Sequence, residues 1–249
     1  MNGRSGLVTG AGSGIGRACA LALAGAGAAV LVSDIDEAAA MATVGLIEAE
    51  GGRAMARRCN VAVESDVAAM VLACVEELGA LDFAVNNAGV VGTQQPLHRC
   101  SLAEWQRIID INLTGMFLCV RDQLNVMYQQ GRGSIVNIAS EAALKGSAAD
   151  AVYTASKHGV AGLTKTAALE AARRGVRVNA VCPGVIETGI LKGVIEANPE
   201  VAEKSKRLMP IGRLGQPEEI AAAVLWLCSD AASLVVGHLL AVDGGWSVS

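Results

Sequence analysis

Short apolar runs of strand type alternate along this chain with longer, alanine-rich segments of helical length. Most of the runs lack polar alternation, a pattern typical of strands covered on both faces of a parallel sheet. The repeated strand–helix–strand order predicts an α/β, doubly wound sheet with right-handed crossovers. The expected strands are 5–9, 29–33, 53–58, 83–86, 133–138, 177–181 and 239–242. The expected helices are 14–26, 36–50, 64–78, 102–129, 152–174 and 217–228.

A single domain is expected over residues 1–249, because no proline-rich linker, charge block or repeat divides the chain. Ser101 followed by Glu104 predicts a capping box at the start of the helix 102–129. The alternation of strands and helices stops at about 186–214, where we expect a lid over the substrate.

Composition argues against several classes of function. A net charge of −4 without a basic run argues against a nucleic-acid partner. The seven cysteines form no C-x-x-C pair and the three histidines have no metal-ligand spacing, so we expect free thiols and no metal. The longest uncharged stretch, 18–33, is shorter than the ~20 residues of a spanning helix. We therefore expect no membrane partner and a cytoplasmic location.

A glycine-rich segment, residues 9–16, joins the first expected strand to the first expected helix. Glycine-rich turns also occur for purely structural reasons, but a turn in this position lets backbone N–H groups approach a pyrophosphate at a helix N-terminus. The expected cofactor contacts in this segment are Gly10, Ser13, Gly14, Ile15 and Gly16.

Asp34 ends the second expected strand, 18 residues after Gly16. An acidic residue about 20 residues beyond such a turn accepts hydrogen bonds from an adenosine ribose. Its carboxylate would repel the 2′-phosphate of NADP, so the sequence favours NAD, although Arg17 lies nearby. The alternative role for Asp34 is to cap the helix that starts at Asp36.

Tyr153 and Lys157 are four residues apart in an expected helix and share one face, with ~6 Å of rise between them. A phenol has an ordinary pKa of about 10, and a nearby cation lowers it toward the range useful for acid–base catalysis. Such a pair alone is common on helix surfaces, so its meaning depends on the residues around it.

The segment 9–16, the run Asn86-Asn87-Ala88-Gly89, Ser140 and the pair Tyr153-x-x-x-Lys157 together resemble the short-chain dehydrogenase/reductase family, in its single-domain branch of about this length. The resemblance implies a Rossmann fold with a seven-stranded parallel sheet flanked by helices. It also implies that Tyr153 is the general acid/base, that Lys157 holds the nicotinamide ribose and lowers the tyrosine pKa, and that Ser140 binds the substrate oxygen.

The same resemblance implies further site residues. Asn112 matches an asparagine that anchors a proton-relay water, although an asparagine within a helix can instead mark a kink. Asn60 and Val61 stand where the family usually has Asp-Val beside the adenine, a departure that leaves an amide carbonyl for the same hydrogen bond. The remaining expected cofactor contacts are Asn87, Ala88, Gly89, Pro183, Gly184, Ile186 and Thr188, besides Tyr153 and Lys157.

These expectations lead to an NAD-dependent enzyme that acts on a secondary alcohol or ketone of modest polarity. An NADPH-dependent 3-oxoacyl-thioester reductase and a catalytically silent NAD-binding sensor stay open as alternatives; an enoyl reductase is disfavoured because that branch spaces its tyrosine and lysine differently. Glu141, beside Ser140, is expected to face solvent. The resemblance further implies a homotetramer joined through 102–129, 152–174 and the C-terminal elements.

Overall fold

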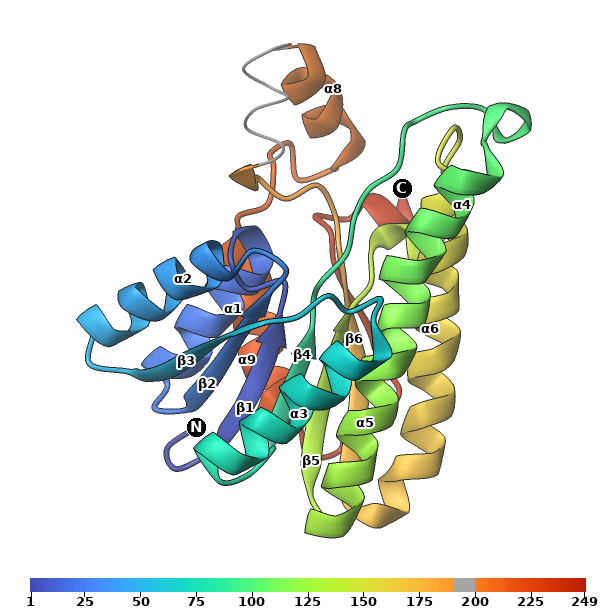
Figure 1. The fold of residues 1–249 in the computed structure, drawn as a ribbon. Coiled ribbons are helices and arrows are strands. Elements are labelled where there is room, and N and C mark those ends of the chain that lie inside the picture. Colours follow the sequence, from blue (N-terminus) through green and yellow to red (C-terminus); the bar gives the residue numbers. More distant parts are fainter. Residues whose placement is uncertain (190–199) are drawn as a thin grey trace.

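Seven parallel strands form one sheet in the order β3-β2-β1-β4-β5-β6-β7 in the computed structural model, which describes residues 1–189 and 200–249 (Figure 1). The strand order reverses between β1 and β4, and in open parallel sheets the carboxyl ends of the strands at such a reversal are where ligands bind. The strands are β1 Ser5–Thr9, β2 Ala29–Asp34, β3 Arg53–Arg58, β4 Phe83–Asn86, β5 Gly133–Ile138, β6 Val176–Pro183 and β7 Leu239–Val242.

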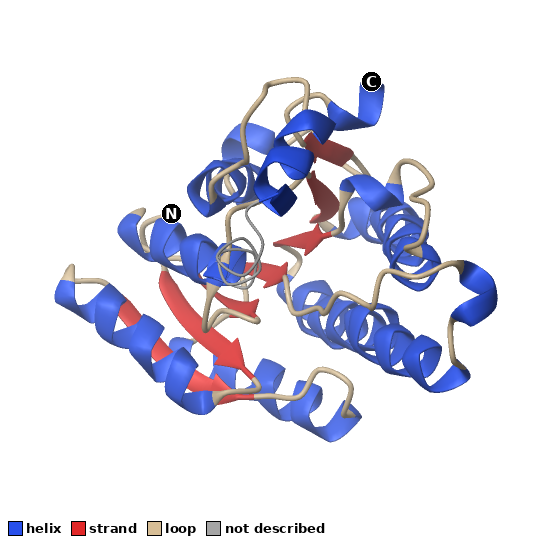
Figure 2. Cartoon of the chain, turned by 90° about the horizontal axis from the view of Figure 1, so that it is seen from above, coloured by secondary structure: helices blue, strands red, loops and turns tan. Residues whose placement is uncertain are grey.

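Helices cover both faces of the sheet, as Figure 2 shows from above. The apolar residues of α1, α2 and α9 form one core against the sheet, and those of α3, α5 and α6 form a second core on the opposite face. The helices are α1 Gly14–Gly25, α2 Glu37–Ala49, α3 Glu64–Leu78, α4 Leu102–Ile109, α5 Gly115–Gln130, α6 Ala151–Ala171, α8 Glu200–Leu208 and α9 Pro217–Cys228. None of these described helices is long and apolar enough to cross a membrane.

The predicted doubly wound, seven-stranded Rossmann sheet is confirmed, and every predicted strand is present. The inner strands β1, β4 and β5 are buried along nearly their whole length because helices cover both of their faces. The edge strand β3 differs, since Arg53, Arg57 and Arg58 are exposed. Charged side chains on an edge strand discourage pairing with another chain.

The predicted helix 102–129 is wrong in one respect, because a π-turn at Asp110–Thr114 divides it into α4 and α5. The predicted capping box is only half formed. The Ser101 side chain accepts from the Glu104 N–H at 3.1 Å. The Glu104 carboxylate instead accepts from the Thr93 N–H at 3.0 Å and pairs with Arg107, so it holds the loop before α4 rather than the helix cap.

Four buried polar side chains connect β4 and β5 to the helices behind them. Asn86 Nδ2 donates to Gln123 Oε1 at 2.9 Å and to Asn137 Oδ1 at 3.0 Å. Gln123 Nε2 donates back to Asn86 Oδ1 at 2.7 Å, and Asn137 Nδ2 donates to Thr164 Oγ1 at 2.9 Å. Because these amides are buried and mutually satisfied, the cluster fixes how α5 and α6 sit against the sheet.

We predict that Asn137→Ala lowers the free energy of unfolding by about 1–3 kcal/mol, because Asn86 and Thr164 each lose a buried hydrogen bond. Thermal unfolding followed by circular dichroism measures the effect, at about 2–4 °C of Tm per kcal/mol. The control is Asn125→Ala at an exposed position of α5, which should change the free energy of unfolding by less than about 0.5 kcal/mol. Equal melting temperatures for the two variants would contradict the role of the cluster.

Candidate active site

The predicted site residues come together at the carboxyl edge of the sheet. They lie in the loops that follow β1 to β6, at the end of β2, at the π-turn and in the first turns of α6. Figure 1 shows α8 on the same side of the molecule, beyond the ends of the strands. Ligands of open parallel sheets bind at this edge, because the loops and helix N-termini converge there.

The loop after β1 has the shape of an anion cradle. Gly10 and Gly14 have φ angles of +62° and +52°, a region that favours glycine. A Cβ at Gly16 would lie 2.2 Å from the Gly10 carbonyl oxygen, so only glycine fits there. Ser13 is exposed at the N-terminus of α1, whose first turn has no side-chain cap and no acidic residue. Its free N–H groups, with Ile15 beside them, fit a pyrophosphate.

Thr9 ties the ends of β1 and β4 together. Its hydroxyl accepts from the N–H groups of Asn87 at 3.0 Å and Ala88 at 3.1 Å. Asn87 Nδ2 donates to the carbonyls of Thr9 at 3.1 Å and Gly10 at 3.0 Å. Thr9 was not among the predicted site residues, although a polar residue at the end of a buried apolar strand is a usable signal in the sequence. Gly89 continues this loop beside Asn112.

Asp34 binds the glycine loop rather than the next helix. Its Oδ2 accepts from the Gly12 N–H at 2.9 Å, and its Oδ1 accepts from the Asp36 N–H at 3.0 Å. Asp36 is the residue that caps α2, through the Ala39 N–H at 3.2 Å, so the alternative role for Asp34 is wrong. The guanidinium of Arg17 donates to Gly12 O and, at 3.0 Å, to Thr43 Oγ1.

Asn60 and Val61 follow β3. Asn60 Oδ1 accepts from the Ala62 N–H at 3.1 Å, and the Asn60 N–H donates to Asp66 Oδ2 at 3.1 Å. The amide carbonyl therefore has one lone pair left for a ligand. Val61 is buried against the position of Gly115, where a Cβ would meet it at 2.9 Å.

The segment after β6 reaches the glycine loop. Pro183 ends the strand, and Gly184 lies so close to the Asp243 backbone that a Cβ would meet it at 2.9 Å. Ile186 forms an isolated bridge with Gly215. Thr188 Cγ2 lies 3.2 Å from the position that a Cβ would take at Gly14. Residues 190–199 of the predicted lid lie outside the described residues.

Ser140, Tyr153 and Lys157 are close together between β5 and α6. Lys157 Nζ donates to the Ile138 carbonyl at 3.0 Å and lies 5.5 Å from the centroid of the Tyr153 ring. Ser140 Oγ accepts from the Ala142 N–H at 3.1 Å and is buried. Burial of the ammonium lowers the pKa of Lys157 to about 8.

The pKa of Tyr153 differs from the expectation. Burial of the phenol raises its pKa above the ordinary value, and the hydrogen bond with the Ser140 hydroxyl only partly counteracts this. The negative charges of Glu141 and Asp150 raise it further. In the chain alone, desolvation therefore outweighs the lowering that was expected from Lys157, whose own charge is disfavoured by burial.

Asn112 lies in the π-turn and is buried. Its Oδ1 accepts from the Val90 N–H at 2.8 Å, and its Nδ2 donates to Val90 O at 2.8 Å and to Ser156 Oγ at 3.3 Å. The side chain thus holds the loop after β4 against α6. The expected irregularity of the helix at Asn112 is present, and π-turns are frequent at functional sites.

Glu141 corrects the expectation of a solvent-facing side chain. It is only 8% exposed, and its Oε2 lies 2.5 Å from Ser140 Oγ. The 3₁₀ turn Glu141–Ala143, which starts directly after Ser140, directs this side chain inward. The signal in the sequence was a single acidic residue between Ser140 and an apolar stretch.

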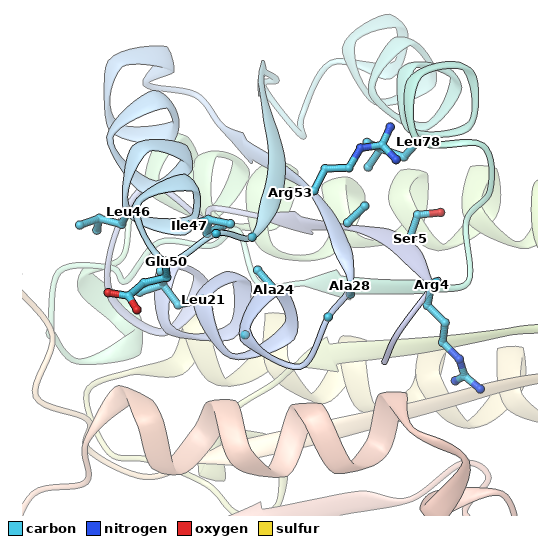
Figure 3. A pocket seen from close by; sticks show the side chains of 16 residues that line it. Arg4, Ser5, Leu21, Ala24, Ala28, Leu46, Ile47, Glu50, Arg53 and Leu78 are labelled. Carbon is cyan, nitrogen blue, oxygen red and sulfur yellow. The ribbon is translucent and has the colours of Figure 1, made fainter.

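A pocket of about 840 Å³ lies at the opposite edge of the sheet (Figure 3). It is lined by the amino ends of β1 to β3 and by α1 and α2, with Arg4, Glu50 and Arg53 among its side chains. None of the predicted site residues lies there. Within the described ranges, no group of three or more His, Cys, Asp or Glu residues is placed to hold a metal ion.

Comparisons with known proteins show which proteins this chain is similar to. A family model described as enoyl-(acyl carrier protein) reductase matches residues 10–247. Cyclohexanol dehydrogenase of Acinetobacter sp. (strain SE19) is 46% identical over 247 residues, which cover 99% of this chain and 96% of that protein. Cis-4-hydroxycyclohexanecarboxylate dehydrogenase of Sinomonas cyclohexanicum is 45% identical over 244 residues, which cover 98% and 96%.

The crystal structure of levodione reductase matches this fold with a TM-score of 0.96 at 36% identity, over 100% of this chain and 99% of that chain. The similarity therefore extends over the whole chain in both sequence and fold. The chain belongs to the short-chain dehydrogenase/reductase family.

Proposed function

We propose that this oxidoreductase transfers a hydride between NAD(H) and a secondary alcohol or ketone of modest polarity, with Tyr153 as general acid/base. The juxtaposition of Ser140, Tyr153 and Lys157 at the carboxyl edge of the sheet carries the proposal. The names of two relatives, which are dehydrogenases of ring alcohols, support a cyclic secondary alcohol as the substrate class.

When bound, the nicotinamide supplies the hydride acceptor in oxidation and the hydride donor in reduction. In oxidation, the Tyr153 phenolate takes the proton of the substrate hydroxyl, while Ser140 holds the substrate oxygen in place. Lys157 holds the ribose side of the site, and Asn112 fixes the loop after β4 and anchors the path by which the proton leaves. In reduction, the Tyr153 hydroxyl returns the proton to the oxygen.

NAD is the cofactor we propose, because the Asp34 carboxylate lies against the glycine loop, bound to the Gly12 N–H at 2.9 Å, and a carboxylate there would accept hydrogen bonds from an adenosine ribose and repel a 2′-phosphate. Arg17 supports the same choice, since its guanidinium is engaged with Gly12 O and Thr43. One feature of the structure favours the competing NADPH-dependent thioester reductase. Arg58 lies opposite Asp34 in the β2–β3 register, and a cation there would suit a 2′-phosphate.

We also propose a cytoplasmic enzyme whose segment 186–214 covers the substrate. The cysteines support the location, because all seven are free thiols and six of them are buried. The described ends of the segment support the cover, because Thr188 lies beside Gly14 of the cradle and Met209 packs near Gly244.

Tyr153→Phe should reduce alcohol oxidation at least about 1000-fold, because the general base is lost while the ring remains. The assay follows reduced nicotinamide by absorbance with cyclohexanol as the first alcohol, and NAD binding is measured by calorimetry. Tyr128→Phe is the matched control. Tyr128 is the other tyrosine of the chain, and its ring lies in α5 against the guanidinium of Arg174. If Tyr153→Phe keeps more than a few per cent of the native activity, Tyr153 is not the general acid/base. If the native protein binds NAD but turns over no alcohol or ketone, the catalytically silent NAD-binding sensor is favoured instead.

Asp34→Asn should shift the ratio of kcat/KM for NAD to that for NADP toward NADP by about tenfold or more, because the repulsive charge is removed while the bond to the Gly12 N–H is kept. Asp36→Asn is the control, since it removes a charge two residues away and retains the cap of α2. A native enzyme that prefers NADP would overturn the NAD proposal and favour the thioester reductase.

A homotetramer joined through α5, α6 and the C-terminal elements completes the proposal. Large apolar side chains are exposed on these parts of the chain, including Leu169 at 81% and Leu234 at 95%. Light scattering after gel filtration should give a mass about four times 25.4 kDa, and Leu234→Glu should lower it. A monomeric native chain would refute the assembly without bearing on the catalytic proposal.

A further inference from the structure

The hydrogen-bond capacity of Ser140 is fully assigned in this structure. A hydroxyl group has one hydrogen and two lone pairs. The Ala142 N–H, at 3.1 Å, uses one lone pair. One hydrogen and one lone pair of Ser140 remain for two further partners. The first partner is Glu141, whose Oε2 is 2.5 Å away, and the second is the Tyr153 hydroxyl, whose place the substrate oxygen would take.

The protonation of Glu141 decides this division. An ionised carboxylate only accepts hydrogen bonds, so it takes the single hydrogen of Ser140 and leaves a lone pair for the partner on the other side. A neutral carboxylic acid donates its own hydrogen to Ser140, and the Ser140 hydrogen is then free to point toward the substrate oxygen. The two states of Glu141 thus give Ser140 opposite hydrogen-bond directions.

We propose that Glu141 is a positioning residue that makes Ser140 a hydrogen-bond donor to the substrate oxygen in its neutral form and an acceptor in its ionised form. This proposal rests on the function proposed above. A ketone oxygen only accepts hydrogen bonds, so it requires Ser140 as a donor, whereas an alcohol hydroxyl is able to donate as well as accept. Neutral Glu141 therefore prepares the site for the ketone, whereas ionised Glu141 is compatible only with an alcohol whose single hydroxyl hydrogen points to Ser140 instead of Tyr153.

The surroundings of Glu141 set the direction of this switch with pH. Burial raises the pKa of Glu141; its hydrogen bonds with Ser140 and with backbone N–H groups, and the charge of Lys145, partly counteract this. A carboxyl group is neutral below its pKa and ionised above it, so the donor state of Ser140 is populated at the lower pH. Lys145 Nζ donates to the Trp246 carbonyl and lies 4.8 Å from the centroid of the Trp246 ring.

Charged or titratable groups on the packed elements face the same space. Tyr153 and Lys157 approach from α6, and the negative charge of Glu141 acts on both of them. From β6, Cys182 approaches Glu141, and burial raises the pKa of this thiol to about 11, which keeps it neutral at working pH. The negative charge of Asp243, which follows β7, raises the pKa of Cys182 further. Ionisation of Glu141 therefore also opposes formation of the Tyr153 phenolate.

The test is the pH dependence of ketone reduction by the native enzyme and by Glu141→Gln, with cyclohexanone or the ketone of whichever alcohol is oxidised. In the native enzyme, kcat/KM for the ketone should fall through the Glu141 ionisation and again, at higher pH, through that of Tyr153. The glutamine amide does not ionise and is able to donate to Ser140 at every pH, so the variant should lose the lower ionisation. Between the two ionisations, it should exceed the native enzyme by about tenfold.

Asp150→Asn is the matched control. Asp150 also acts on Tyr153 through its charge, but it has no hydrogen bond with Ser140 among the described contacts. This variant should shift the Tyr153 ionisation and retain the lower one. A pH profile of Glu141→Gln that matches the native profile would overturn the proposal, and so would loss of the lower ionisation in Asp150→Asn.

An infrared titration tests the inference without any substrate. The native enzyme should show the C=O band of a buried carboxylic acid, which disappears as pH rises and is missing from Glu141→Gln. Absence of that band at all pH values at which the native enzyme is folded would overturn the role of Glu141. If the band is present but no ketone is reduced, the proposed function fails and the protonation of Glu141 stands as measured.

Discussion

The hydroxyl of Thr9 is the interaction on which the functional edge of the sheet depends. It accepts from two consecutive N–H groups after β4, and Asn87 returns two bonds to the carbonyls of Thr9 and Gly10. These bonds fix the separation of β1 and β4 where the strand order reverses. The glycine loop is therefore set relative to the loop after β4, which Asn112 in turn holds against α6. One short chain of side chain–backbone bonds thus relates the anion cradle to the helix that bears Tyr153.

Much of this architecture could be predicted from sequence, because strands buried on both faces give unbroken apolar runs. Five of the seven strands match the expected bounds, and β2 and β6 extend the expected runs by one to three residues. The π-turn was not predicted, because it depends on Asn112 reaching the backbone of Val90, 22 residues away. Glu141 was placed wrongly for a related reason. Its burial follows from the direction of a 3₁₀ turn after β5, and no local periodicity encodes that direction.

Two kinds of buried polar group coexist in the molecule. The amides of Asn86, Gln123 and Asn137 satisfy one another and stay neutral, so their burial stabilises the contact of sheet and helices. Lys157 and Glu141 are buried beside neighbours that leave part of the desolvation cost uncompensated, as the directions of their pKa shifts indicate. Burial of these two groups lowers the stability of the fold, but it also moves their pKa values toward the range in which groups change protonation readily, as proton transfer requires.

The contact of Lys145 with Trp246 has a practical consequence for handling the protein. Lys145 lies four residues after Glu141 and holds the 3₁₀ turn Trp246–Val248 through a carbonyl and an aromatic ring. The C-terminal turn is thereby tethered to the loop that carries Ser140, whereas Met1 lies at the far edge of the sheet (Figure 1). An affinity tag fused behind Ser249 would therefore be attached close to the loop that carries Ser140. A tag ahead of Met1 lies away from that loop, so a fusion at the N-terminal end is the better choice for measuring the native activity.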